Sequence, residues 1–224
     1  MFDIADLVSL IITVPVVLIA LTFHECAHGF VAYKLGDPTA KINGRLSLNP
    51  MRHIDIFGAI SLILFHFGWA RPVPINTRYF KNPKRGMALS ALAGPVTNLL
   101  LGFIGCLLYS IVLFIFRGVE VNKITYWLVF IILEFFFYFA WLNISLAIFN
   151  LIPLPPLDGS RIFMVFLPER IYFSIMRYER EIALGFFALL LLDSRWLGGH
   201  ITGGLSYIVN LVFNGFMSLF SFIF

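Results

Sequence analysis

Residues 7–33 read LVSLIITVPVVLIALTFHECAHGFVAY, and this stretch decides the class of fold. A helix of this length, at about 1.5 Å per residue, exceeds the ~30 Å hydrocarbon core of a bilayer. The stretch therefore predicts a membrane-spanning helix that tilts or protrudes. Three ionisable side chains, His24, Glu25 and His28, interrupt its otherwise apolar second half. Because ionisable groups inside a span are costly, we expect these three to form a functional site.

The composition extends this prediction to the whole chain. The 224 residues are 60% hydrophobic and 12% charged, whereas soluble domains average about 45–50% apolar and about 25% charged. Long apolar spans are expected at about 87–116 and 124–150, and residues 182–224 hold a short and a longer apolar run. We therefore predict an all-α polytopic membrane protein with about five to six transmembrane helices.

We expect one membrane-embedded domain over residues 1–224, because no polar linker divides the chain. Its core would cover about residues 7–165, and C-terminal helices would follow at about 181–224. Inside the core, residues 54–70 form an apolar piece that is too short to span. This piece predicts a small re-entrant or β-hairpin element after the first helix.

The loop over residues 34–86 indicates the topology. It holds nine of the 16 Lys and Arg residues, against only Asp37 and Asp55 as acids. Basic loops stay on the cytoplasmic side, so the loop is expected in the cytoplasm and the N-terminus outside. The net charge of +4 is small and lies in loops, so we expect no nucleic-acid partner.

The residues at 23–28, Phe23-His24-Glu25-Cys26-Ala27-His28, fit the pattern H-E-x-x-H. On a helix, His24 and His28 differ by about 40° in direction and face one point. Glu25 lies about 100° away, where it can take a proton from a metal-bound water. Cys26 lies on the far face and is not assigned as a ligand. A chance occurrence of the pattern is the alternative, but imidazoles beside an acid in an apolar helix favour a zinc site.

Catalytic zinc sites usually have three protein ligands, and Asp158 is the best third candidate. It ends the segment 150–159, whose prolines at 153, 155 and 156 exclude a regular helix. Irregular backbone at membrane depth is buried in protein or lines a wet cavity, where an acid needs a partner. A helix cap at Asp158 is the alternative. Both motifs lie at span ends that the charge pattern places in the cytoplasm, so a shared site there is expected.

These residues resemble the site-2 protease family of intramembrane metalloproteases. The family joins H-E-x-x-H in one helix to an N-x-x-P-x-x-P-L-D-G signature in another. Together the matching motifs cover about residues 18–165, and they resemble a compact bacterial branch without PDZ or CBS domains. The matches are Asn150, Pro153, Pro156 and Leu157-Asp158-Gly159, with further motifs at 44–50, 68–74 and 93–98.

The resemblance implies a metalloendopeptidase of the cell membrane that uses one Zn²⁺ per chain. It implies His24, His28 and Asp158 as zinc ligands and Glu25 as general base. It further implies that Asn150 stabilises the oxyanion or positions the substrate. The substrates would be transmembrane segments of other proteins within the lipid bilayer; the oligomeric state stays open.

Two other readings stay open at this point. One is a metal transporter that uses the same His and Asp side chains as a transit site, although transport has no need of Glu25 as a base. The other is an inactive relative that binds membrane proteins without cutting them. Among the remaining polar residues, Asn98 is expected to hydrogen-bond a neighbouring helix, and His53 and Asp55 are expected on a polar loop surface.

Overall fold

The computed structural model describes residues 4–56, 58, 70–195 and 199–221. Eight α-helices lie in these ranges, with three short 3-10 helices between them. The α-helices are α1 (Ile4–Lys34), α2 (Thr39–Ile42), α4 (Pro83–Phe116), α5 (Lys123–Asn150), α6 (Asp158–Phe163), α7 (Glu169–Arg177), α8 (Glu179–Arg195) and α9 (His200–Phe220). The 3-10 helices are η1 (Pro50–Arg52), η2 (Thr77–Tyr79) and η3 (Met164–Phe166).

The predicted all-α membrane fold is confirmed. Four of the described helices, α1, α4, α5 and α9, are long and apolar enough to cross a bilayer. The expectation of five to six spans is too high for the described residues. The short apolar run after residue 182 lies in α8, which has 17 residues and begins with charged side chains at 179–181. Its apolar part is shorter than the ~20 residues that a spanning helix needs.

The predicted hairpin at 54–70 lies mostly outside the described residues, which stop at 58 and resume at 70. Its two ends are joined by an isolated antiparallel bridge between Ile54 and Ala70. Next to the bridge, the Arg71 N–H donates to the His53 carbonyl at 2.8 Å. Within the described ranges the structure holds this bridge and no β-strand.

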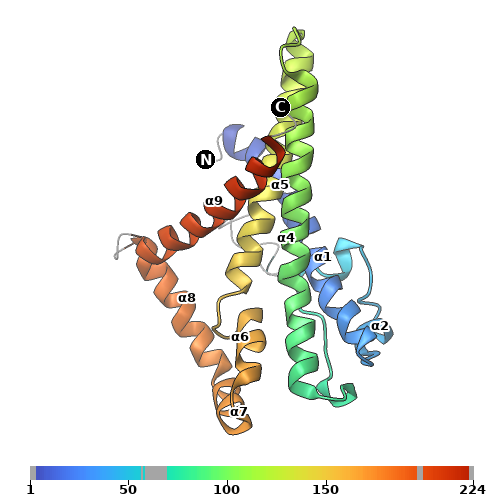
Figure 1. Ribbon diagram of the computed structural model, residues 1–224, viewed down its shortest axis with the longest axis vertical. Helices are drawn as coiled ribbons and strands as arrows, with labels where there is room; N and C mark the ends of the chain where they lie inside the picture. Colours follow the sequence, from blue (N-terminus) through green and yellow to red (C-terminus); the bar gives the residue numbers. More distant parts are fainter. Residues whose placement is uncertain (1–3, 57, 59–69, 196–198, 222–224) are drawn as a thin grey trace.

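Helix α4 is the central element, and it packs against α1, α5, α6 and α9 (Figure 1). Its contact with α5 is close because α4 presents glycines there. A Cβ on Gly105 would lie 2.9 Å from the backbone of Ala140, and one on Gly102 would lie 2.6 Å from Cγ1 of Ile144. Small residues let membrane helices approach closely without a hydrophobic driving force. Helix α9 joins this contact through the buried Val209 and Phe220.

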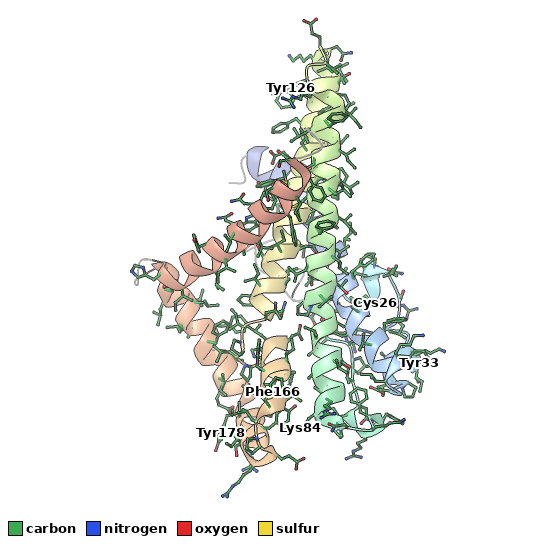
Figure 2. The ribbon with its side chains drawn as sticks, viewed as in Figure 1. Cys26, Tyr33, Lys84, Tyr126, Phe166 and Tyr178 are labelled. Atoms are coloured by element: carbon green, nitrogen blue, oxygen red, sulfur yellow. The ribbon has the colours of Figure 1, made fainter. Side chains whose placement is uncertain are left out.

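The chain between α5 and α9 returns to the foot of α4. Figure 2 shows Lys84, in the first turn of α4, beside the segment that links α6 to α7. Its ammonium donates to the Leu167 carbonyl and lies 5.5 Å from the ring centre of Tyr172. A bidentate ion pair between Arg161 and Glu179 ties α6 to the start of α8. The first contact ties the segment after α6 to α4, and the second ties α6 to α8. Helix α6 itself, which carries Asp158, packs against α4.

Candidate metal centre

The structure brings together the three predicted ligands from two distant helices. His24 and His28 lie one turn apart on α1, and Asp158 is the first residue of α6. The distances from Asp158 Oδ2 are 3.2 Å to His24 Nε2 and 3.3 Å to His28 Nε2. Both imidazoles are buried. One donor atom from each of the three residues lies within 4.8 Å of the other two.

The second ring nitrogen of each histidine fixes its orientation. His28 Nδ1 lies 2.7 Å from the Ser90 carbonyl, which can only accept, so Nδ1 carries the proton. His24 Nδ1 bonds to Asn98 Oδ1. The Asn98 amide nitrogen donates to Asn143 Oδ1 at 2.7 Å, which leaves its oxygen to accept from His24. Both Nε2 atoms therefore turn bare lone pairs toward Asp158.

The arrangement fits a divalent cation and fits zinc well. Two imidazole lone pairs and one carboxylate oxygen converge in a buried space, and Asp158 Oδ2 has no hydrogen-bond partner there. Such a convergence is unfavourable unless a cation binds to it. An N2O donor set matches three-ligand zinc sites. Metal-binding histidines usually donate their other N–H to a carbonyl or carboxylate, as His24 and His28 do to oxygen acceptors here.

Gly94 of α4 lies directly against the two imidazoles. A Cβ at this position would lie 2.5 Å from Cε1 of both His24 and His28. Helix α4 therefore forms one wall of the site, and only glycine fits at the point of contact. The sequence motif at 93–98 contains Gly94 and Asn98, but its role in seating the imidazoles follows from the packing alone.

Asp158 does not cap a helix through its side chain. It is itself the first residue of α6, and the N-cap position is Leu157, which makes no side-chain cap bond. The preceding loop packs tightly on this turn, since a Cβ on Gly159 would lie 2.3 Å from the Ile152 carbonyl oxygen. The loop also contains a cis peptide between Pro155 and Pro156. The cap alternative from the sequence therefore does not describe this structure.

Glu25 is held by backbone from the α1–α4 loop. Its Oε2 accepts the Val73 N–H at 2.8 Å. Pro72 and Pro74 flank this donor and have no N–H of their own. Arg45 in turn donates to the carbonyls of Arg71 and Pro72. The segment 71–74 is thus fixed between a buried arginine and the glutamate beside the ligands.

Asn150 is the last residue of α5, and its Nδ2 donates to the Leu146 carbonyl at 2.9 Å. Its described hydrogen bond therefore goes to its own helix. Cys26, labelled in Figure 2, lies on α1 within hydrogen-bonding reach of the Ser47 backbone. Within the described residues it is not part of the cluster of possible metal ligands.

Three polar residues support the two histidines, and the sequence analysis singled out one of them. Asn98 hydrogen-bonds helices α1 and α5, as expected. Ser90 and Asn143 were missed, and the one signal for Asn143 was a polar side chain within an apolar span.

The expectation of a surface position for His53 is wrong: it is 2% exposed, and its Nε2 donates to the Ser47 carbonyl at 2.7 Å. This hydrogen bond joins two positions of the α1–α4 loop, 47 and 53.

Comparison with known proteins identifies the family of the chain. The model of peptidase family M50 matches residues 119–192. The chain is 41% identical over 208 residues to "Putative zinc metalloprotease YwhC" of Bacillus subtilis (strain 168). The aligned region covers 92% of this chain and 90% of the relative. It is 27% identical over 148 residues to "Putative zinc metalloprotease Rip2" of Mycobacterium tuberculosis (strain ATCC 25618 / H37Rv), 63% of this chain.

The chain matches about half, 52%, of the length of Rip2. No solved structure matches. The long match to the Bacillus relative extends the family assignment over nearly the whole chain, including α1 with its two histidines. The chain belongs to peptidase family M50, the site-2 protease family, in a compact form.

Proposed function

We propose that this protein is an intramembrane zinc metalloprotease that hydrolyses peptide bonds in transmembrane segments of other proteins. The observation that carries the proposal is the convergence of His24 Nε2, His28 Nε2 and Asp158 Oδ2. Glu25 follows His24 directly on the same spanning helix. A transit site for metal has no need of a carboxylate held in that position.

His24, His28 and Asp158 would hold one Zn²⁺ per chain. When bound, zinc acts as a Lewis acid and lowers the pKa of a coordinated water to about 7. The histidine orientation needed for this is set in advance by Ser90 and by the Asn98–Asn143 pair. Such outer partners typically change metal affinity by about 10–100-fold.

Glu25 would act as general base and then as general acid. The Val73 N–H binds Oε2 and fixes the carboxylate, so Oε1 would be the oxygen that accepts the proton of the attacking water. The same carboxylic acid would return the proton to the leaving amine.

Asn150 would bind the substrate carbonyl oxygen or position the scissile segment. Its Nδ2 bonds the Leu146 carbonyl, so this role requires the side chain to turn when substrate enters. The substrate is a transmembrane helix whose peptide bonds are shielded, so it must unwind locally. The element at 54–70 would pair with the unwound strand by β-addition.

The proposed location is the cell membrane, with the site toward the cytoplasm. The α1–α4 loop and Asp158 lie at span ends that carry most of the basic residues. At the opposite ends of α4 and α5, by contrast, the basic residues are only Arg117 and Lys123. This asymmetry supports the orientation through the positive-inside rule.

The first test is Glu25→Gln in the full-length protein. Because Gln is isosteric but cannot take a proton, purified Glu25→Gln should keep about one zinc per chain and lose proteolysis. The Asp158→Ala variant should lose the zinc as well. Zinc content is measured by elemental mass spectrometry, and cleavage by comparing membrane-protein fragments in cells that carry either form.

Three outcomes would decide between the readings. Equal fragment patterns in wild-type and Glu25→Gln cells would exclude the protease and favour a relative that binds without cutting. Zinc movement across vesicles that is insensitive to Glu25→Gln would favour a transporter. A folded wild type without zinc would contradict the metal assignment.

A further inference from the structure

The loop between α1 and α4 contains a pocket that none of the three metal ligands lines. Its volume is about 560 Å³. Three arginines, Arg45, Arg52 and Arg71, line it together with Asn43, and no acidic residue is among the described residues of its wall. The pocket lies on the segment 71–74, whose Val73 N–H binds Glu25.

Arg45 is buried and only partly satisfied. It is 7% exposed, and one of its terminal nitrogens donates to the carbonyls of Arg71 and Pro72. Its Nε is buried and has no acceptor. Burial lowers the pKa of the Arg45 guanidinium, and the nearby Glu25 only partly opposes this effect. A desolvated cation with an unused donor is unfavourable unless an anion binds beside it.

Among the described residues, Glu25 is the acid near Arg45, and its Oε2 already binds the Val73 N–H. None of the ion pairs among the described residues involves the three arginines. Asp37, one of the two acids of the loop, accepts the N–H groups of Thr39 and Asn76. The other, Asp55, accepts the Gly58 N–H. Arg52 and Arg71 are exposed, so the pocket offers one buried and two accessible guanidinium groups to an anion from outside the chain.

The surroundings of the pocket indicate where this partner comes from. The loop joins two spanning helices, α1 and α4, so it lies at a face of the membrane. Met51, which lines the pocket, is exposed, and so are Ile42 and Leu48 in the same loop. At a membrane surface these side chains would contact lipid rather than water. Phospholipid headgroups bring phosphate to that depth, and the anionic ones also carry the net negative charge that the three arginines would attract.

We propose that this pocket binds the phosphate of an anionic phospholipid headgroup. Guanidinium groups bind phosphate oxygens in bidentate fashion, and several arginines together match its charge and its number of acceptors. A bound headgroup would also rest on the segment 71–74 and so stabilise the backbone that holds Glu25.

The test is lipid binding to the detergent-purified full-length protein, followed by native mass spectrometry. Phosphatidylglycerol should bind more tightly than phosphatidylcholine. Arg52→Gln and Arg71→Gln should each weaken phosphatidylglycerol binding by about fivefold, the effect of one basic residue at a membrane surface. Arg78→Gln is the matched control, since Arg78 is exposed in the same loop and does not line the pocket.

Zinc content measured on the same samples shows that the variants are folded, and the assay can be run in Glu25→Gln protein, independently of proteolysis. Equal phosphatidylglycerol binding in wild type and both pocket variants would overturn the proposal. Equal binding of the two lipids would overturn it too. Inorganic phosphate that binds the pocket without a preference for the anionic lipid would exclude the lipid as the source.

Discussion

The metal centre depends on side chains that never touch a metal. Gly94 seats both imidazoles, Ser90 and Asn98 accept their Nδ1 protons, and Asn143 orients Asn98. Each acts by removing an alternative position or tautomer of a ligand. Substituting these residues therefore tests the metal site while leaving its three ligands unchanged.

Gly94→Ala should abolish or strongly weaken metal binding. The new Cβ would lie 2.5 Å from Cε1 of both histidines, and their Nδ1 bonds leave them no room to move together. We expect zinc affinity to fall at least about 10-fold, as for other disturbed outer partners. Affinity is measured by competition with a chelator of known strength.

The control for Gly94→Ala is Gly215→Ala. Gly215 is also a helical glycine, but a Cβ there meets nothing within 4 Å. Both substitutions change helix propensity equally, so only the contact with the imidazoles differs. Wild-type zinc affinity in Gly94→Ala would contradict the packing described for α4.

At the scale of single helices, the contact between α4 and α5 sets the shape of the bundle. Gly105→Ala should destabilise the protein, because its Cβ would lie 2.9 Å from the Ala140 backbone, which cannot move by a rotamer change. Overpacking of this kind costs about 1–3 kcal/mol. Thermal unfolding in detergent should show a lower midpoint for Gly105→Ala, whereas Gly215→Ala should match wild type.

Asp193 at the end of α8 caps the N-terminus of α9. Its carboxylate accepts the Ile201 N–H at 3.1 Å and the Thr202 N–H at 2.9 Å. The Thr202 N–H lowers the pKa of the Asp193 carboxyl more than the opposing burial raises it. Since the folded pKa is depressed, the cap is fully present above the ordinary Asp value of about 3.9 and is lost as pH falls through the lower folded value.

Hydrogen exchange tests this cap. Protection factors at Ile201 and Thr202 should stay constant from neutral pH down to about pH 4 and fall below it. Asp193→Ala should lower them several-fold at neutral pH, and the difference from wild type should disappear at low pH, where the carboxyl is protonated. The Gly199 N–H bonds the main-chain oxygen of residue 193 and serves as an internal control. Unchanged protection at Thr202 in Asp193→Ala would mean that the carboxylate does not cap α9.

At the scale of the whole molecule, three long helices, α1, α4 and α5, enclose the site. Helices α8 and α9 diverge on the other side of the molecule from α2 (Figure 1). Helix α9 returns to pack on α4 and α5, while α7 and the start of α8 lie at the foot of the bundle. The basic residues gather at that foot and in the α1–α4 loop.

The distribution of basic residues predicts the membrane topology, which can be measured with single cysteines. In a background without Cys26 and Cys106, cysteines at Arg78 and Arg177 should react with an impermeant maleimide only after lysis. A cysteine at Glu120, between α4 and α5, should react in intact cells. Reaction of positions 78 and 120 from the same side would mean that α4 does not cross the membrane.

The sequence by itself determined the spans α1, α4 and α5, because long apolar runs have few alternatives to a membrane helix. It also determined that His24 and His28 face one point, since helical periodicity places side chains four residues apart on one face. It left the number of spans less certain: the apolar run in α8 follows three charged residues, and four of the described helices are long and apolar enough to cross.

Only the tertiary structure decided which groups surround the ligands. The partners of His24, His28 and Glu25 lie 74, 62 and 48 residues away in the chain. Such contacts depend on how α4 and the loop pack on α1, and no local pattern encodes that packing. For the same reason, the burial of His53 and Arg45 was not visible in a loop that reads as polar. Sequence periodicity fixes directions within one helix, whereas distances between helices follow from the fit of all their side chains.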